Sequence, residues 1–218
     1  AVQWPGAERR LKQSLLANKA ADEAIRDSGI ELDQVDRERF GCSVSAVMAD
    51  WTFLHSEGSY FRSGYYNIDQ QTPWVAQWLP NTPVADVATR RGLHGPRTAY
   101  SSACASGLMG VLSAVRSIRD SQCDIALAGA GDAIDGLMAS GFRKMRALAE
   151  HDEPQRACRP FDKNRNGFVL GEGAAMLVLE RLGHALAQND QVAFRATARI
   201  DADLIDSTSN SAAVVDTD

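Results

Sequence analysis

The sequence of 218 residues has no long hydrophobic run, no excess of basic residues and no paired cysteine motif. A membrane-spanning helix needs about 20 apolar residues in a row, and Gly or Asp interrupts each apolar stretch here before that length. We therefore predict no transmembrane helix. Residues 1–6 contain neither an initiator Met nor a basic segment followed by an apolar run, so we expect no secretory signal and a truncation at this point. Together these absences predict a cytoplasmic protein.

Charge and cysteine content exclude two further classes of protein. The 23 Lys and Arg residues are outnumbered by 28 Asp and Glu residues, which gives a formal net charge of −5. Nucleic-acid binding depends on clustered basic residues, so we do not expect nucleic acid as a partner. The cysteines show no Cys-x-x-Cys spacing and are too few for a disulfide scaffold at this length. We expect free thiols at Cys42, Cys104, Cys123 and Cys158.

Two stretches resemble ligand-binding loops, but neither keeps the required spacing. Residues 162–167 begin like a calcium-binding loop, yet the twelfth position is Gly173 and Glu172 falls one residue short. The glycines at 129 and 131 are followed by Ile134 where a dinucleotide-binding fingerprint needs its third glycine. We therefore predict no metal and no nucleotide cofactor.

Strand and helix patterns alternate along the chain. Helices are predicted where apolar residues recur every three or four positions, and two of them end at a glycine, Gly29 and Gly92. Short runs of small and β-branched residues predict buried strands. Such alternation is typical of a layered α/β domain with a mixed, mostly parallel sheet. The predicted helices cover 8–28, 80–91, 108–118 and 137–148, the predicted strands cover 42–48, 98–104, 123–129 and 174–179, and the aromatic-rich segment 50–66 is predicted to be an insertion loop.

Cys104 is the candidate nucleophile, because the predicted strand turns directly into the predicted helix at this residue. The start of a helix offers unpaired N–H groups and partial positive charge, which favour a thiolate and can also hold an oxyanion. Small neighbours, from Ala103 to Gly107, would let a substrate approach closely. Free cysteine is also a common buried small residue, so position alone leaves both interpretations open.

Four segments carry ordered, specific patterns: Ser101–Gly107 around the cysteine, Asp124–Asp132, Gly141–Phe142 with Met145–Leu148, and Arg159–Ala174. In this order they resemble the active-site cysteine segment, a glycine-rich turn, the loop that borders the acyl pocket and the long Arg-Pro-Phe-Asp signature of β-ketoacyl-ACP synthases. Asp132 replaces the usual Glu of that family, and Asn164 and Asn166 stand where Asp is common. The resemblance covers 79–187, whereas 1–78 fits loosely and 201–218 hardly at all.

The resemblance implies the thiolase-like fold, in which two similar α/β halves pack together. Residues 1–200 would form the N-terminal, nucleophile-bearing half, and the polar tail 201–218 would lie at the junction to a missing C-terminal half. In the family the other half supplies two histidines and a segment that completes the oxyanion hole. The four histidines of this chain, His55, His94, His151 and His184, stand in unrelated contexts.

The resemblance also implies an activity and partners. Cys104 would accept an acyl group from acyl carrier protein, and condensation with a malonyl thioester would serve fatty acid or polyketide biosynthesis. Phe142 would line the acyl tunnel. The basic residues Arg143, Lys144 and Arg146 would dock the acidic carrier, with an ordinary solvated helix face as an equally open interpretation. Family members pair the strand 97–102 with its two-fold mate, so we expect a homodimer.

A non-catalytic interpretation stays open beside the enzymatic one. A chain without the histidine-bearing half could be a truncated or degenerate paralogue that binds acyl chains or a synthase partner. Cys104 argues against a protein like a chain-length factor, since those proteins typically lack this cysteine. Thiolase itself is a weaker alternative, because the pattern over 159–174 is a feature of the synthases.

Overall fold

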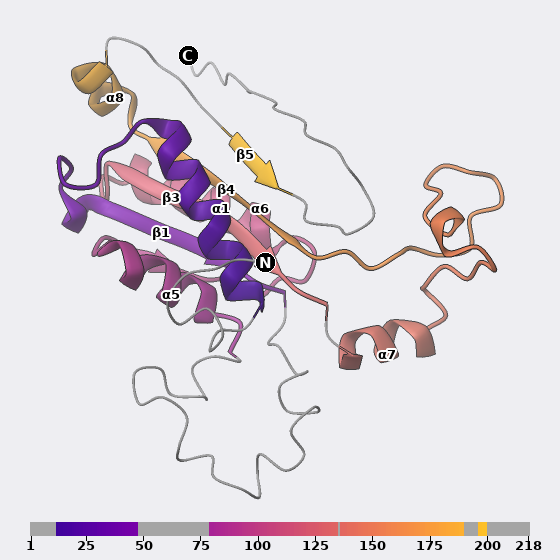
Figure 1. Ribbon diagram of the computed structural model, residues 1–218. Coiled ribbons are helices and arrows are strands. Elements are labelled where there is room, and N and C mark those ends of the chain that lie inside the picture. The colour runs from indigo at the N-terminus through magenta and orange to yellow at the C-terminus, as the bar shows by residue number, and fades with distance from the viewer. Residues whose placement is uncertain (1–11, 48–78, 135, 190–195, 200–218) are drawn as a thin grey trace, which may run out of the picture.

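A five-stranded sheet forms the centre of the molecule (Figure 1). The computed structural model describes residues 12–47, 79–134, 136–189 and 196–199. The strands are β1 (Phe40–Ser45), β2 (Arg97–Thr98), β3 (Ile125–Asp132), β4 (Gly173–Glu180) and β5 (Ala196–Arg199), in the order β2-β1-β3-β4-β5. Strand β1 pairs in parallel with β2 and β3, whereas β4 pairs antiparallel with β3 and β5. The predicted layered α/β architecture with a mixed sheet is confirmed.

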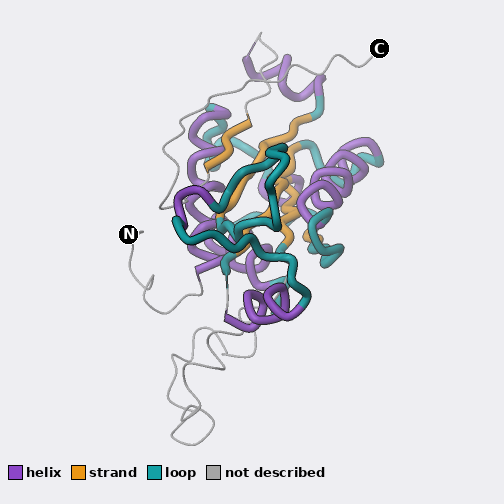
Figure 2. The backbone as a smooth tube through the Cα atoms, turned by 90° about the vertical axis from the view of Figure 1, so that its right-hand side faces the viewer, coloured by secondary structure: helices purple, strands orange, loops and turns teal. Residues whose placement is uncertain are grey.

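Helices cover both faces of this sheet, as Figure 2 shows. Helices α1 (Lys12–Ser28) and α5 (Thr82–Arg91) lie on one face, and α6 (Ser106–Arg119) lies on the other. Side chains alternate between the faces along a strand. In β1 the Cys42 thiol accordingly points to Val84 of α5, while Ser43 points to the hydroxyl of Thr98, beneath α6. The remaining helical elements are η2 (Arg37–Arg39), α7 (Gly136–Lys144), η4 (Pro154–Arg156) and α8 (Leu182–Asn189).

The two faces bury side chains of different size. Between the sheet and helices α1 and α5, the core contains large side chains such as Phe40, Leu127 and Met176. Beneath α6 the buried cluster consists of three alanines and Cys123. Because small side chains fill less space, α6 lies closer to the sheet than a helix packed through leucines would. Three larger side chains that pack against this small cluster are only partly buried: Val111, Ile118 and Leu179.

The structure confirms that two of the predicted helices end at a glycine. Gly29 and Gly92 both have left-handed backbone, with φ of 72° and 62°. The N–H of Gly92 donates to the carbonyl groups of Ala88 and Thr89 at the end of α5, the usual way in which a left-handed residue ends a helix. Residues 8–11 of the first predicted helix, the predicted loop 50–66 and the tail 201–218 lie outside the described residues.

Two predicted elements differ most from the structure. The strand expected over 98–104 ends at Thr98, because the chain leaves the sheet to form the turn that precedes α6. The helix expected over 137–148 ends at Lys144, and Arg146 has a left-handed φ of 56°. In the part of the chain that the structure describes, every helix is too short or too polar to cross a membrane.

Candidate active site

Cys104 lies exposed in a tight turn immediately before α6. Ala103, directly before it, has a left-handed φ of 49°, a conformation that costs a non-glycine residue about 1–2 kcal/mol. Two backbone bonds close the turn: Ala105 donates to Ser102 over 3.2 Å and Ser106 donates to Ala103 over 3.0 Å. The predicted direct passage from strand to helix at Cys104 is therefore wrong. Cys104 instead lies in a turn between the end of β2 and the start of α6, two residues before the first residue of that helix.

Small residues form the underside of α6 and set its distance from the sheet. The buried positions are Ser106, Gly110, Ser113 and Ala114. A Cβ atom at Gly110 would lie 3.2 Å from the carbonyl oxygens of Gly129 and Ser43, which is tighter than ordinary packing. Gly110 therefore allows the backbone of α6 to rest almost directly on β1 and β3.

The apolar stripe predicted on this helix is largely turned to solvent. Leu108 is 76% exposed, and Leu112 and Val115 on the same stripe are exposed as well. Val111 and Ile118 are partly buried at the border of the small cluster. The helix itself is confirmed over Ser106–Arg119, but the sheet packs against its small residues and leaves the large ones uncovered.

Hydroxyl groups attach the segment before Cys104 to the end of β1. The backbone N–H of Tyr100 donates to Ser45 Oγ over 3.1 Å. Ser101 Oγ donates to the carbonyl of Val47 over 3.0 Å. Asp132, which stands in place of the usual Glu, accepts the N–H of Val47 at 2.7 Å and so ties the ends of β3 and β1 together. These contacts were not foreseen from the sequence, because they join residues that are far apart along the chain.

Burial separates the four thiols into two pairs. Cys42 and Cys123 are buried, and Cys104 and Cys158 are exposed. Desolvation raises the pKa of Cys42 to about 12, against the opposing effect of Arg91 and Arg97. Burial also raises the pKa of Cys123. A thiol must ionise to act as a nucleophile, so the folded chain offers Cys104 and Cys158 for chemistry.

The other predicted site residues gather at the end of α7. Phe142 packs edge to face against Phe168, with ring centroids 5.1 Å apart and an interplanar angle of 81°. Arg143, Lys144 and Arg146 are exposed beside it. Arg143 and Lys144 lie in α7 and Arg146 follows it, and in Figure 1 α7 lies apart from α6.

Two of the sequence motifs meet in space. The backbone of Phe168, in the segment 159–174, accepts from Ala149 at 2.9 Å and donates to Ala147 over 3.0 Å. This bridge holds the segment against the residues that follow α7. Phe161 in the same segment is 98% exposed. Glu172 at its end accepts the N–H of Ile134 at 3.3 Å and pairs with Lys12 of α1.

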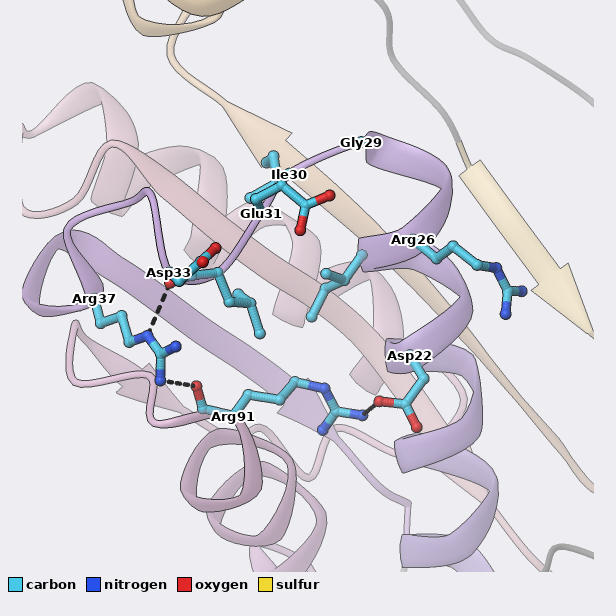
Figure 3. Close-up of a pocket in the computed structure, with 10 residues that line it drawn as sticks. Asp22, Arg26, Gly29, Ile30, Glu31, Asp33, Arg37 and Arg91 are labelled. Carbon is cyan, nitrogen blue, oxygen red and sulfur yellow. Dashed lines mark hydrogen bonds and ion pairs between the residues drawn. The ribbon is translucent and has the colours of Figure 1, made fainter.

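A groove of about 560 Å³ lies on the other side of the sheet, between the ends of α1 and α5 (Figure 3). Its floor holds Arg91, whose side chain is 6% exposed and pairs with Asp22. Arg91 also donates to Asn18 Oδ1 at 2.9 Å and to the Asn18 carbonyl at 2.7 Å, which joins the two helices. Burial lowers the pKa of Arg91, and Asp22 opposes that effect. No nucleophile lines the groove, so we place the candidate active site at Cys104.

Metal ligands do not cluster in the described ranges. Within residues 12–47, 79–134, 136–189 and 196–199, no three His, Cys, Asp or Glu side chains come together as a metal site would require. His184 pairs with Glu180, and His151 Nδ1 accepts the N–H of Glu153 at 2.9 Å. His55 lies outside the described residues.

Solved structures share this fold. A β-ketoacyl synthase from Burkholderia phymatum superimposes with a TM-score of 0.76 at 29% identity, over 89% of this chain and 49% of that one. The ketosynthase complex AntDE:AntF superimposes with a TM-score of 0.66 at 19% identity, over 86% of this chain and 54% of that one. The predicted thiolase-like fold is therefore confirmed.

Sequence comparison agrees with the structures. The actinorhodin polyketide putative β-ketoacyl synthase 1 of Streptomyces coelicolor is 36% identical over 85% of this chain and 41% of its own length. The 3-oxoacyl-[acyl-carrier-protein] synthase 2 of Vibrio cholerae is 32% identical over 79% of this chain and 42% of its own length. The chain thus spans about two fifths of the length of these relatives. The family model of the β-ketoacyl synthase N-terminal domain matches residues 4–185, and the chain therefore belongs to the β-ketoacyl synthase family.

Proposed function

We propose that this chain is the nucleophile-bearing part of a β-ketoacyl-ACP synthase and that Cys104 carries the acyl group. The observation that supports this most is the position of Cys104, exposed on a tight turn at the start of α6. In the reaction Sγ attacks the thioester carbonyl, and the N–H groups at the start of the helix stabilise the oxyanion. The carrier thiol then leaves with the proton, and a thioester to Cys104 remains.

The second step that we propose is decarboxylative condensation. Loss of carbon dioxide from a malonyl thioester gives an enolate, whose α-carbon attacks the acyl group and releases the Cys104 thiolate. This step needs donors aimed at the enolate oxygen, and the family resemblance assigns that role to two histidines of the other half. The relatives that support this activity include a polyketide putative β-ketoacyl synthase and a 3-oxoacyl-[acyl-carrier-protein] synthase.

A second half would also account for the apolar stripe on α6. Leu108, Leu112 and Val115 lie one helical turn apart and are exposed. Side chains of this size on one helix face normally lie against another element. We propose that residues 1–200 form the N-terminal domain, that the tail 201–218 leads to the second half, and that this half covers the stripe.

Acyl carrier protein is the partner that we propose for α7. Arg143, Lys144 and Arg146 expose three cationic groups within one turn, and acidic surfaces associate with such groups by charge complementarity. Phe142, packed on Phe168, would line the acyl tunnel nearby. One of the superimposed structures is itself a type II polyketide carrier protein in complex with its ketosynthase.

We also propose a homodimer in the cytoplasm. Strand β2 is at the edge of the sheet and pairs on one side with β1, so its other edge can pair with a second copy through residues 97–102. The four cysteines are free thiols, as is usual in reducing compartments.

Acylation tests the proposal directly. Incubation with an acyl carrier protein thioester should add one acyl group to Cys104, located by peptide mass. The variant Cys104→Ala should stay unmodified and Cys158→Ala should be acylated like the parent. If the parent chain binds the acyl carrier protein and Cys104 remains free, the non-catalytic alternative is correct.

Condensation is tested with the same samples after addition of malonyl carrier protein. The 218-residue chain by itself should form no β-ketoacyl product, because each missing oxyanion donor costs a factor of about 10²–10³ in rate. Clear product from this polypeptide would mean that one of its own groups performs the role that we assign to the second half.

A further inference from the structure

Ser106 holds the turn that carries Cys104. It is the first residue of α6 and is 1% exposed, so its side chain points inward rather than toward a substrate. Its hydroxyl accepts the backbone N–H of Ser102 at 2.8 Å and donates to the carbonyl of Ala103 at 2.7 Å. One buried hydroxyl therefore bridges the two residues that precede Cys104.

This bridge lies next to the residue of the turn that has an unfavourable backbone conformation. Ala103 has the left-handed φ of 49°, and a non-glycine residue keeps this conformation only when its surroundings impose it. Ala105, at the N-cap of α6, has no side-chain oxygen to bond the first N–H groups of the helix. The Ser106 hydroxyl supplies the side-chain bonds that the turn otherwise lacks.

The bridge also connects the turn to a rigid part of the fold. The hydroxyl lies on the underside of α6, where a Cβ at Gly107 would lie 3.3 Å from Ala130 and one at Gly110 would lie 3.2 Å from the backbone of two strands. A helix packed this closely has little freedom to shift. The position of Ser102 and Ala103 is thereby fixed relative to the sheet.

We propose that Ser106 is a positioning residue that keeps the Cys104 thiol in front of the first N–H groups of α6. The inference rests on the proposed role of Cys104 as the nucleophile. Without the hydroxyl, Ala103 relaxes toward ordinary backbone angles and Cys104 spends less time in the reactive position. A purely structural serine would lower the stability of the fold and leave the relative reactivity of Cys104 unchanged.

The test compares two thiols within one molecule. Limiting iodoacetamide is added to the 218-residue chain, and the alkylation rates of Cys104 and Cys158 are measured by peptide mass. Their ratio is independent of protein concentration, and it is measured well below the melting temperature of every variant, so that it reports on the folded chain. In Ser106→Ala the ratio should fall at least about five-fold, because five-fold corresponds to the net contribution of one buried hydrogen bond and the variant loses two.

Two further variants make the test specific. Ser113→Ala is the matched control, since Ser113 is a buried serine on the same face of α6 that bonds Thr98 at 3.1 Å, away from the turn. It should lower the melting temperature to a similar extent and leave the ratio unchanged. Ser106→Thr keeps a hydroxyl at the site and should restore the ratio to within about two-fold of the parent.

The outcomes distinguish a positioning role of Ser106 from a purely structural one. An unchanged ratio in Ser106→Ala, an equal fall in Ser113→Ala, or no recovery in Ser106→Thr would overturn the inference. Alkylation needs no acyl substrate, so this result is independent of the acylation experiment. If Ser106→Ala lowers the ratio but the parent takes no acyl group, the proposed function fails and the positioning of the thiol stands.

Discussion

Gly129 should tolerate no side chain, because it lies in the middle of β3 with neighbours on both faces. A Cβ atom there would overlap the carbonyl oxygen of Ala175 and lie 2.8 Å from the sulfur of Met176, both on β4. On the other face the Gly129 carbonyl oxygen is the atom that α6 approaches at Gly110. The backbone of β3 therefore cannot move away from β4 without pressing against α6, the helix that follows Cys104.

The cost of Gly129→Ala follows from this geometry. Overpacking a core by a methyl group costs about 1–3 kcal/mol when side chains can yield, and more when they cannot. Here the nearest atom belongs to the backbone of a paired strand, so relief requires breaking ladder hydrogen bonds between β3 and β4. We expect a loss of at least about 3 kcal/mol, which lowers the melting temperature of a chain of this size by about 6–12 °C.

Thermal unfolding followed by circular dichroism measures this effect. Gly141→Ala is the matched control, since a Cβ atom at Gly141 on α7 would meet nothing within 4 Å. That variant should stabilise the chain by about 0.5–1 kcal/mol, because alanine favours a helix over glycine. If Gly129→Ala melts within 1 °C of the parent, β4 adapts more easily than the packing indicates and the reasoning is refuted.

Three further predictions concern the thiols, the buried cation and the sheet edge. Because its pKa is raised to about 12, Cys42 stays protonated in the folded chain while the unfolded thiol ionises from pH 9 upward. Stability should therefore decrease as the pH rises from 9 toward 12, and Cys42→Ala should remove that part of the decrease in urea titrations. Arg91→Met should cost about 3 kcal/mol in the same titrations, since the Asn18 oxygens lose their donors; a change below about 1 kcal/mol would contradict this. Light scattering at micromolar concentration should show a dimer, whereas a folded monomer would refute pairing through residues 97–102.

The sequence was sufficient where local chemistry determines the structure. Gly29 and Gly92 end helices because only a residue without a Cβ adopts left-handed backbone at low cost, and both were predicted from their positions. The strand over 174–179 was predicted within one residue at each end, because its composition suits a buried strand. The placement of Cys104 before a helix followed from the same kind of local pattern.

The sequence was insufficient where contacts between residues far apart along the chain determine the structure. The end of α7 at Lys144 depends on the bridge from Ala147 and Ala149 to Phe168, some twenty residues further along the chain. Likewise, the periodicity of α6 identified an apolar stripe but could not indicate which face the sheet covers. Small residues at Gly110 and Ala114 face the sheet because the backbone of β3 comes so close.

The two faces of α6 therefore serve different purposes, and this explains why its sequence is unusual for a surface helix. A helix that only had to bury apolar area would turn Leu108 and Leu112 to the sheet, since each would then contribute about 2 kcal/mol. The observed orientation leaves that contribution to the proposed second half and brings Gly110 and Ser106 to the sheet instead. What it gains is a helix start held at a fixed height above β1 and β3, with a buried hydroxyl available to bond the turn. Cys104 therefore needs no contact of its own side chain to hold it in place, because the backbone beneath it fixes its position.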